Sequence, residues 1–398
     1  MTRQMQDAYI VAATRTAVGK APRGAFKSTR PDTLLAHVLR SVLAQAPAID
    51  PRRIEDVIVG CAMPEYEQGM NVARIGVLLA GLPDSVAGMT VNRFCSSGLN
   101  AISIAADRIR TGEADIMIAA GTESMSMIPM LGRLAINEAV FARGENVGIA
   151  YGMGLTAEKV ATQWKVSRDD QDAFALASHR KALAAQAAGE FDAEISPTAV
   201  NEDAPDLATG KIVTKSRVIQ RDEGPRADTS AEGLAKLRPV FAAKGSVTAG
   251  NSSQMSDGAG ASLLVSEGVL RELDLTPLAR WVGFAVAGVP PEIMGVGPIA
   301  AIPKVLKTTG IRLDQLDWIE LNEAFAAQAI AVMRDLGLDP AKVNPVGGAI
   351  ALGHPLGATG AIRTATITHG MKRRNQKYGM VSMCVGTGMG AAGIFEAM

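Results

Sequence analysis

The stretch IEDVIVG, residues 54–60, has the apolar, β-branched character of a buried strand, and its pattern returns in LDWIELN, residues 316–322. In both places a Val-Asn pair, a glycine-containing turn and an alanine-rich helical pattern follow, and then a second apolar strand. That second strand is DIMIAAGTE (115–123) in the first set and VSMCVGTG (381–388) in the second. The repeated succession predicts an internal duplication.

Strand patterns alternate with alanine-rich helical patterns along both halves of the chain. The predicted strands are AYIVAATR (8–15), EDVIVGC (55–61), AGMTVN (87–92), ADIMIAAGTE (114–123), ARWVGFAVAG (279–288), DWIELNEA (317–324), KVNPVGG (342–348) and GMVSMCVGTG (379–388). Such alternation is typical of layered α/β proteins. We therefore expect a duplicated, layered α/β fold.

Between the two halves, from residue 124 to residue 245, the sequence changes to charged helices and polar loops. Ser167 to Asp170 predicts a capping box at the start of a helix, and residues 201–230 predict an irregular, turn-rich loop. Long loops inside compact proteins tend to form binding surfaces. We predict an N-terminal half (1–123 plus 246–272), an inserted loop domain that binds the substrate (124–245) and a C-terminal half (273–398).

Charge and apolar content exclude several classes of protein. The 398 residues include 40 Lys plus Arg and 40 Asp plus Glu, so no overall field attracts nucleic acid or an anionic membrane. Two stretches without charge, 343–362 and 378–395, are too rich in glycine and proline to form continuous apolar helices. We expect no nucleic-acid partner and no membrane span.

Three cysteines, Cys61, Cys95 and Cys384, are too few and too far apart for a disulfide framework or a C-x-x-C metal site. This usage favours a reducing compartment. The opening residues have neither the apolar core of a secretory signal nor the pattern of a transit peptide. We expect a cytoplasmic location and no metal ion.

Cys95 lies in VNRFCSSGLNAI, where an extended stretch meets a helical pattern. Apolar residues recur after it at spacings of three and four, which places Cys95 at the first turn of the helix. Unpaired N–H groups and the helix dipole favour a thiolate there, so we expect a lowered pKa. A lone cysteine is more often a small buried apolar residue, and we interpret Cys61 in that way.

His354 is the best candidate for a general base among four histidines, because it lies in the glycine-rich turn GGAIALGHPLGATG. The other three, His37, His179 and His369, are expected to be structural or to face solvent. Cys384 ends an apolar strand before a second glycine-rich turn, and two thiols in different environments can act as nucleophile and proton carrier. Asn322 follows another predicted strand, where ligands meet layered α/β folds.

Together, VNRFCSSGLNAI, NEAFA, GHPLGATG and CVGTGMG resemble the four signatures of the thiolases, in the same order and over essentially the whole chain. The resemblance implies an α-β-α-β-α fold and coenzyme A (CoA) as a substrate, with no other cofactor. Cys95 matches the nucleophile that becomes acylated, and His354 matches its base, assisted by a water on Asn322. Cys384 matches the second cysteine, which moves a proton at the α-carbon of acetyl-CoA. The N–H groups of Cys95 and Gly386 match an oxyanion hole.

The resemblance also implies residues that bind the substrate. These are Arg226 at the adenine end of CoA, Ser253 and Ala249 along the pantetheine arm, and Met153, Met294 and Phe325 around the acyl group. It further implies a homodimer or a homotetramer.

Two departures from the pattern of acetoacetyl-CoA-forming thiolases favour the degradative 3-ketoacyl-CoA type. Cys95 is followed by Ser-Ser-Gly instead of Gly-Ser-Gly, and Gly152 stands where those enzymes carry a histidine. Thr359 replaces a frequent serine and keeps the hydroxyl. The alternative is a biosynthetic acetoacetyl-CoA thiolase.

Three other classes of protein fit less well. A non-catalytic, thiolase-like lipid-binding protein would lack a catalytic group, and none is missing. A dinucleotide oxidoreductase needs G-x-G-x-x-G, but GVGPIA (295–300) lacks the third glycine. Decarboxylating condensing enzymes pair their cysteine with two histidines or with a histidine and an asparagine, which the Cys384 signature argues against.

Overall fold

The computed structural model describes residues 5–130 and 135–398. Its large sheet has the order β10-β11-β12-β9-β1-β8-β5-β3-β4, with the short strand β2 beside β8, and β6 and β7 pair separately. The strands are β1 (Ala8–Arg15), β2 (Gly19–Lys20), β3 (Asp56–Gly60), β4 (Ala87–Val91), β5 (Ile116–Ser124), β6 (Thr198–Asp206), β7 (Lys211–Ile219), β8 (Ser256–Ser266), β9 (Ala279–Gly288), β10 (Trp318–Leu321), β11 (Tyr378–Val385) and β12 (Met389–Ala397).

The helices cover and separate the parts of this sheet. They are α1 (Pro31–Ala44), α2 (Val72–Leu79), α3 (Ser97–Arg110), α4 (Met153–Gln163), α5 (Arg168–Ala187), α6 (Ala231–Ala235), α7 (Glu267–Glu272), α8 (Gly297–Thr309), α9 (Ala326–Leu336), α10 (Ala349–Leu352) and α11 (Thr359–Arg373).

The sheet consists of two halves with the same plan, which confirms the predicted duplication. In the first half β3 is parallel to β5, β5 is antiparallel to β8, and β8 is antiparallel to β1. In the second half β10, β11, β12 and β9 follow each other with the same three relations. The halves meet where Tyr9 and Ile10 of β1 pair with Arg280 and Ala279 of β9.

One predicted strand is wrong. Residues 342–348 should match β4, but only a single parallel bridge forms there, between Ile319 and Val343. Asn344 has a left-handed backbone, with φ of +45°, and Pro345 has no N–H to donate, so the chain cannot continue as a strand.

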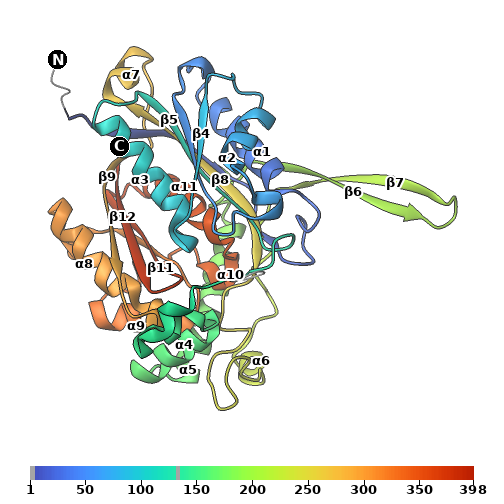
Figure 1. Cartoon of the computed structure of the whole chain (residues 1–398), viewed down its shortest axis with the longest axis vertical. Coiled ribbons are helices and arrows are strands. Elements are labelled where there is room, and N and C mark those ends of the chain that lie inside the picture. Colours follow the sequence, from blue (N-terminus) through green and yellow to red (C-terminus); the bar gives the residue numbers. More distant parts are fainter. Residues whose placement is uncertain (1–4, 131–134) are drawn as a thin grey trace.

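The helices complete five layers, as predicted (Figure 1). Two helices, α3 and α11, lie between the half-sheets, and α11 touches strands of both halves. The outer face of the first half-sheet packs against α1 and α2, and that of the second half-sheet against α8 and α9. Each interface buries a separate apolar cluster, and this burial is the main stabilising term of the fold.

The beginnings of α3 and α11 are in very close contact, and glycine makes this possible. A Cβ on Gly360 would lie 2.1 Å from the backbone nitrogen of Leu99, and one on Gly98 would lie 2.7 Å from the backbone nitrogen of Ala361. No side chain fits at either position. The two helix N-termini therefore lie side by side.

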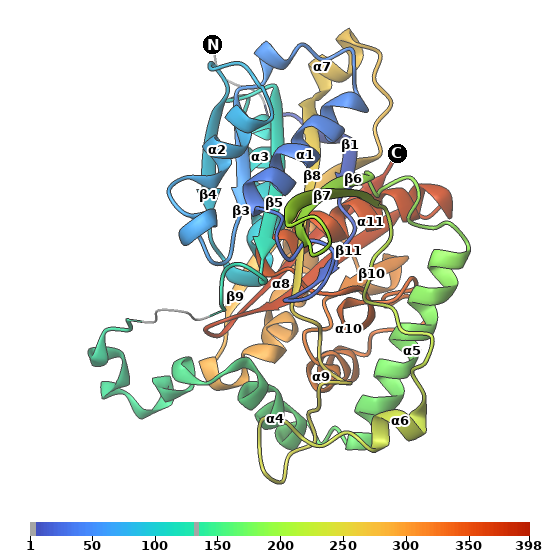
Figure 2. The same ribbon diagram turned by 90° about the vertical axis from the view of Figure 1, so that its right-hand side faces the viewer.

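The inserted segment, residues 124–245, supplies α4 and α5 on the side of the second half (Figure 2). Ser167 accepts from the N–H of Asp170 and the carboxylate of Asp170 accepts from the N–H of Ser167, so the predicted capping box is confirmed. The boundaries of the three predicted domains stay a prediction, and residues 1–4 and 131–134 fall outside the described residues.

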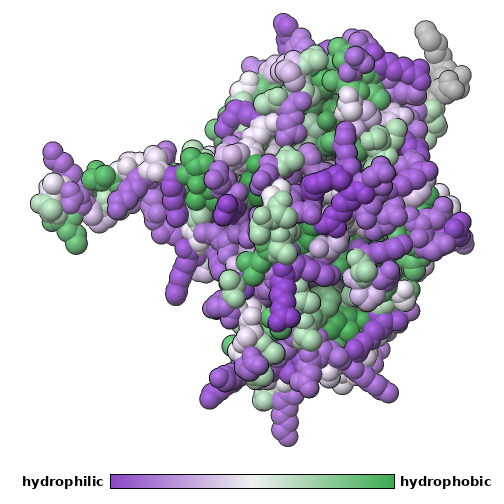
Figure 3. Space-filling view, turned by 180° about the vertical axis from the view of Figure 1, so that it is seen from behind, coloured by the Kyte–Doolittle hydropathy of each residue, from purple (hydrophilic) through white to green (hydrophobic). Residues whose placement is uncertain are grey.

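The expectation of an irregular loop at 201–230 is wrong for most of that stretch. Residues 198–219 form the hairpin β6–β7, which projects from the body of the molecule (Figures 1 and 3). Its charged residues hide the alternation of a strand, because both faces of the hairpin are open to solvent except at its base.

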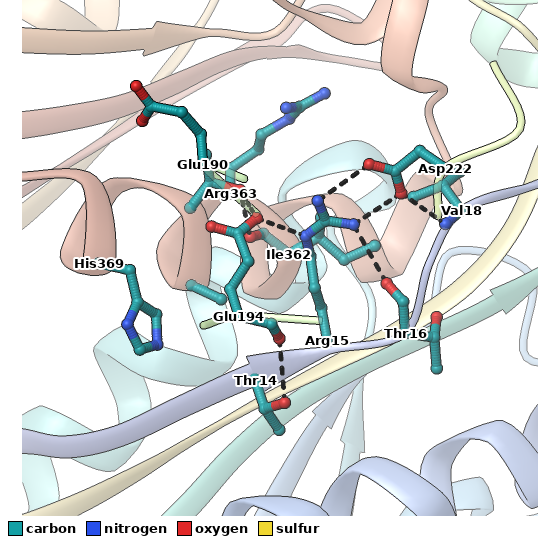
Figure 4. A network of polar contacts seen from close by, with 12 residues as sticks. Thr14, Arg15, Thr16, Val18, Glu190, Glu194, Asp222, Ile362, Arg363 and His369 are labelled. Atoms are coloured by element: carbon teal, nitrogen blue, oxygen red, sulfur yellow. Dashed lines mark hydrogen bonds and ion pairs between the residues drawn. The ribbon is translucent and has the colours of Figure 1, made fainter. Parts of the chain in front are cut away.

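A buried ion cluster closes the base of this hairpin (Figure 4). Nε of Arg15 donates to Glu194 at 2.6 Å, and its two terminal nitrogens donate to the two carboxylate oxygens of Asp222 at 2.7 and 3.0 Å. Glu194 precedes β6 and Asp222 follows β7. One guanidinium therefore holds both the exit and the return of the chain.

No helix among residues 5–130 and 135–398 combines the length and the apolar character needed to cross a membrane.

Candidate active site

A cavity of about 490 Å³ brings three of the predicted catalytic side chains together. Cys95 comes from the start of α3, His354 from the loop between α10 and α11, and Cys384 from the end of β11. Two different halves of the chain thus contribute to one site, because α3 and α11 begin side by side between the half-sheets.

Cys95 lies in a 3₁₀ turn, Phe94–Ser96, that leads directly into α3. Phe94 has a φ of +42°, and the hydroxyl of Ser97 accepts from the N–H of Arg93 at 2.8 Å and donates to the carbonyl of Phe94 at 2.7 Å. These contacts fix the turn, and Cys95 is left half-buried.

The expected lowering of the Cys95 pKa is wrong. Burial raises the pKa of this thiol to about 12, and backbone hydrogen bonding from Gly386 and from Cys95 itself only partly opposes this. The effect of removing the thiolate from water is larger than that of the helix start. The resting nucleophile is therefore a thiol that must lose its proton during the reaction.

His354 follows Gly353, whose φ of +90° turns the chain out of α10. Its Nδ1 lies 2.6 Å from the hydroxyl of Thr359, and its Nε2 lies 3.3 Å from the side-chain nitrogen of Asn322. With the amide of Asn322 donating to Nε2, Nδ1 carries the proton and donates to Thr359, and Nε2 is the unprotonated, basic nitrogen. Burial and the charge of Arg363 lower the pKa of His354 to about 3, so the imidazole is neutral.

Cys384 is fully buried one residue before the end of β11, where it pairs with Gly390 of β12. Burial raises its pKa well above that of a free thiol, and the proximity of Cys95 adds to this effect. Cys384 is therefore protonated and can supply a proton, as the sequence led us to expect.

Asn322 and Gly386 complete the predicted catalytic set. Asn322 follows β10, and its backbone N–H donates to Ser382 at 2.9 Å, which anchors the residue beside β11. Its side-chain oxygen is buried without a hydrogen-bond partner among the described residues. Gly386 follows β11 and lines a second cavity, of about 400 Å³, together with Cys95 and Phe94.

Ser253, predicted along the pantetheine arm, and Met153, Met294 and Phe325, predicted around the acyl group, all line the 490 Å³ cavity. The other two, Arg226 and Ala249, line a third cavity, of about 470 Å³. Ser252 and Gln254 line both cavities. The cavity around Arg226 at the surface and the cavity around Cys95 are therefore neighbours that share part of their walls.

Comparisons with known proteins identify the family of the chain. The model of the thiolase N-terminal domain matches residues 8–268, and that of the thiolase C-terminal domain matches residues 275–397. The chain belongs to the thiolase family. Residues 124–245 lie within the first of these matched regions.

Individual thiolases resemble the chain over nearly its whole length. The 3-ketoacyl-CoA thiolase of Bacillus subtilis is 50% identical over 98% of this chain and 100% of its own length. The crystal structure of the Bacillus anthracis acetyl-CoA acetyltransferase has a TM-score of 0.89 with 40% identity and covers all of both chains. That of the human mitochondrial 3-ketoacyl-CoA thiolase has a TM-score of 0.87 with 36% identity and covers 99% of both chains.

The structure adds residues to this thiolase site that the sequence did not indicate. His179, expected to be structural or to face solvent, lines the third cavity and accepts from the N–H of Arg226 at 3.2 Å. Burial and the charge of Arg226 lower its pKa to about 4, so it is a neutral acceptor. Lys20 lines the same cavity from the N-terminal half. Neither lies in a motif, so only the fold brings them to the site.

Within residues 5–130 and 135–398, no group of three His, Cys, Asp or Glu side chains is placed to hold a metal ion.

Proposed function

We propose that this thiolase cleaves 3-oxoacyl-CoA with free CoA to give acyl-CoA and acetyl-CoA, reversibly, through an acyl group on Cys95. The observation that carries the proposal is the single cavity shared by Cys95, His354 and Cys384, which shares wall residues with the cavity around Arg226. A nucleophile, a neutral base and a neutral acid are the groups that such a cleavage needs.

In the first half of the reaction, Nε2 of His354 accepts the proton of Cys95, and the sulfur adds to the 3-keto carbon. The bond between C2 and C3 then breaks, and its electron pair becomes the enolate of acetyl-CoA. The Cys384 thiol gives its proton to C2, so acetyl-CoA leaves as a neutral thioester. The acyl group remains on Cys95.

In the second half, the thiol of a new CoA gives its proton to the Cys384 thiolate, and its sulfur attacks the acyl-cysteine carbonyl. The carbon–sulfur bond to Cys95 breaks, acyl-CoA leaves, and Cys95 recovers its proton from His354. Donors fixed around the thioester oxygens stabilise both charged intermediates, and each is worth about 3 kcal/mol in comparable enzymes. We assign this role to a water on Asn322 and to the N–H groups of Cys95 and Gly386.

Space beside the nucleophile favours substrates with a larger acyl group than acetoacetyl-CoA. Gly152 lines the cavity, and a Cβ added to it would meet nothing within 4 Å. An imidazole at this position would fill that space. We therefore favour the degradative type, 3-ketoacyl-CoA thiolase, with the biosynthetic acetoacetyl-CoA type as the alternative.

Mass spectrometry tests the acyl-cysteine directly. We expect a 3-oxoacyl-CoA without free CoA to add an acyl mass to Cys95, and CoA to remove it. Folded protein with Cys95 unmodified under both conditions would contradict the proposal. A series of 3-oxoacyl-CoA chain lengths separates the two types, because the biosynthetic type would turn over acetoacetyl-CoA alone.

We further propose that two copies of the chain pair along β4. This strand ends the large sheet, and it is partly exposed along its whole length, unlike the fully buried β3 and β5. Nearby apolar side chains are also open, with Leu78 50% and Leu79 51% exposed. An open edge with apolar neighbours is suited to isologous pairing in a dimer.

Light scattering tests the pairing. Met89→Glu on β4 is expected to give monomers, whereas Val213→Glu on the β6–β7 hairpin leaves the dimer intact. If Val213→Glu instead halves the mass, the hairpin holds copies together in a tetramer. An unchanged mass in both variants contradicts pairing along β4.

We also propose a cytoplasmic location for this reaction. All three cysteines are free, and a reducing compartment keeps Cys95 and Cys384 in that state. Fractionation of cells that express the full chain tests this, and enrichment outside the cytoplasm would contradict it.

A further inference from the structure

Two contacts attach the loop that carries His354 to the other half of the molecule: the N–H of His354 donates to the hydroxyl of Ser256 at 3.1 Å, and the N–H of Gly357 donates to a buried acid, Glu123. Its side chain, at the end of β5, is 1% exposed. One carboxylate oxygen accepts from the backbone N–H of Gly357 at 2.8 Å and from that of Ala62 at 2.8 Å. The other accepts from Gln68 at 2.7 Å and from the N–H of Met63 at 3.3 Å.

These four contacts determine the charge of Glu123. All four partners are N–H donors, and the thiol of Cys61 also donates to this carboxylate at 4.0 Å, so the geometry offers a carboxyl proton no oxygen to bond to. The carboxylate form satisfies every donor, and each such bond to an ion is stronger than a neutral one. Burial raises the pKa of Glu123 above its ordinary value, and the donors oppose this only in part.

The contact with Gly357 matters because this residue lies in the same short loop as His354. The loop lies directly on the ends of β3 and β5: a Cβ on Gly357 would be 2.5 Å from the nitrogen of Ala62, and one on Gly121 would be 2.6 Å from the carbonyl oxygen of Gly357. Among the described residues, Glu123 is the only charged side chain that hydrogen-bonds to residues 353–358. Since it lines none of the three cavities, it does not touch substrate.

We propose that Glu123 is a positioning residue for the thiolase reaction: its carboxylate joins the His354 loop to the half of the molecule that carries Cys95, and so sets the distance between base and nucleophile. This inference rests on the proposed function. Misplacement by about 1 Å of a group that must transfer a proton can slow a reaction about 100-fold, so one misplaced loop has a large effect.

Glu123 has a second, measurable effect on the site. It is the one charged group whose field raises the pKa of Cys95. The other titratable neighbours, His354 from its loop and Cys384 from β11, are neutral at rest. Removing the charge of Glu123 should therefore make Cys95 easier to deprotonate, although the base becomes misplaced.

Two variants separate position from charge. Glu123→Gln removes the charge and turns an NH₂ group toward two of the N–H donors. We expect acylation of Cys95 by 3-oxoacyl-CoA to slow between about 10-fold and 100-fold, while alkylation of Cys95 by iodoacetamide shifts to lower pH. Glu123→Asp keeps the charge but is one methylene too short to reach Gly357. It should slow acylation to a similar extent and leave the alkylation profile in place.

Asp56→Asn is the matched structural control, because Asp56 is a nearly buried acid at the opposite end of β3, paired with Arg108. It should lower the melting temperature without altering either rate for folded protein.

Glu123 variants that acylate within twofold of wild type overturn the proposal and leave the proposed function standing. Parallel losses of acylation and alkylation that follow the unfolded fraction also overturn it. If wild-type protein is not acylated at all, the proposed function itself fails. Should Glu123→Gln not fold, Glu123→Asp decides alone.

Discussion

The two halves of this thiolase place different chemical groups at the same point of one structural plan. In the N-terminal half, a 3₁₀ turn with Cys95 leads into α3. In the C-terminal half, a 3₁₀ turn at 356–358, just after His354, leads into α11. Because the two helices begin in contact, the duplicated scaffold brings the nucleophile of one half to the base of the other.

The comparison also shows an unequal division of the chemistry. Cys95 is half-buried and belongs to the N-terminal half, whereas His354, Cys384 and Asn322 are buried and belong to the C-terminal half. The nucleophile is thus partly open to solvent, whereas the side chains that handle protons are shielded from it. In a dry site hydrogen bonds and charges act more strongly.

Replacing the base should have the largest effect. His354→Asn removes Nε2 as proton acceptor, so single-turnover acylation of Cys95 should slow between about 10²-fold and 10⁴-fold. Mass spectrometry of quenched samples measures this. The matched control is His369→Asn, in α11, where the imidazole hydrogen-bonds to the carbonyl of Ala13. Similar acylation rates in both variants would show that His354 is not the base for Cys95.

Cys384→Ala tests the division of labour within the C-terminal half. We expect Cys95 still to be acylated by a simple acyl-CoA, because that step needs no proton at C2. Cleavage and condensation should fall about 10²-fold to 10⁴-fold. Steady-state thiolysis measures the loss. Cleavage near the wild-type rate would contradict the role given to Cys384.

Gly360→Ala tests the contact between the beginnings of α3 and α11, which brings the two halves of the site together. Its Cβ would lie 2.1 Å from backbone of α3, which cannot move without the rest of the central layer, so the free energy of unfolding should fall by about 3 kcal/mol. Denaturant unfolding measures this. Gly268→Ala in α7 is the control: its Cβ meets only the hydroxyl of Ser266, at 3.7 Å, and a helical alanine gains up to about 1 kcal/mol. Equal stability of the two variants would mean that α3 and α11 do not touch in this way.

The pH dependence of stability should show the smallest effect. The unfolded chain protonates His354 near pH 6.5 but the folded protein does so only near pH 3. Its contribution is therefore complete above pH 6.5 and is lost as the pH falls. Relative to His354→Asn, wild-type protein should lose about 1 kcal/mol between pH 6.5 and pH 5.5. Parallel stability curves would show that the imidazole is hydrated and the site is not dry.

The strands and the central helices were predictable because apolar periodicity and glycine-rich turns are local signals. Cys384 and Asn322 were found for the same reason, since each lies next to a strand with a clear pattern. The pKa of Cys95 was not predictable, because the sequence shows that a helix starts there but not how much protein covers the sulfur.

The errors elsewhere have similar causes. The strand expected at 342–348 fails because of the backbone of Asn344 and Pro345, although its composition suits a strand. The hairpin at 198–219 was missed because solvent surrounds it, and His179 and Glu123 were missed because their partners are distant in sequence. Sequence patterns report local structure, whereas these features depend on tertiary contacts.

The Arg15 cluster has a consequence for how this protein can change over evolutionary time. Since Glu194 and Asp222 both bind the guanidinium of Arg15, the two ends of residues 195–221 are held in place. Beyond Asp222, Glu223 accepts from the N–H groups of Lys20 and Ala25, which secures the segment leading to Arg226. The hairpin can therefore gain, lose or exchange residues at its tip while the walls that receive substrate keep their place.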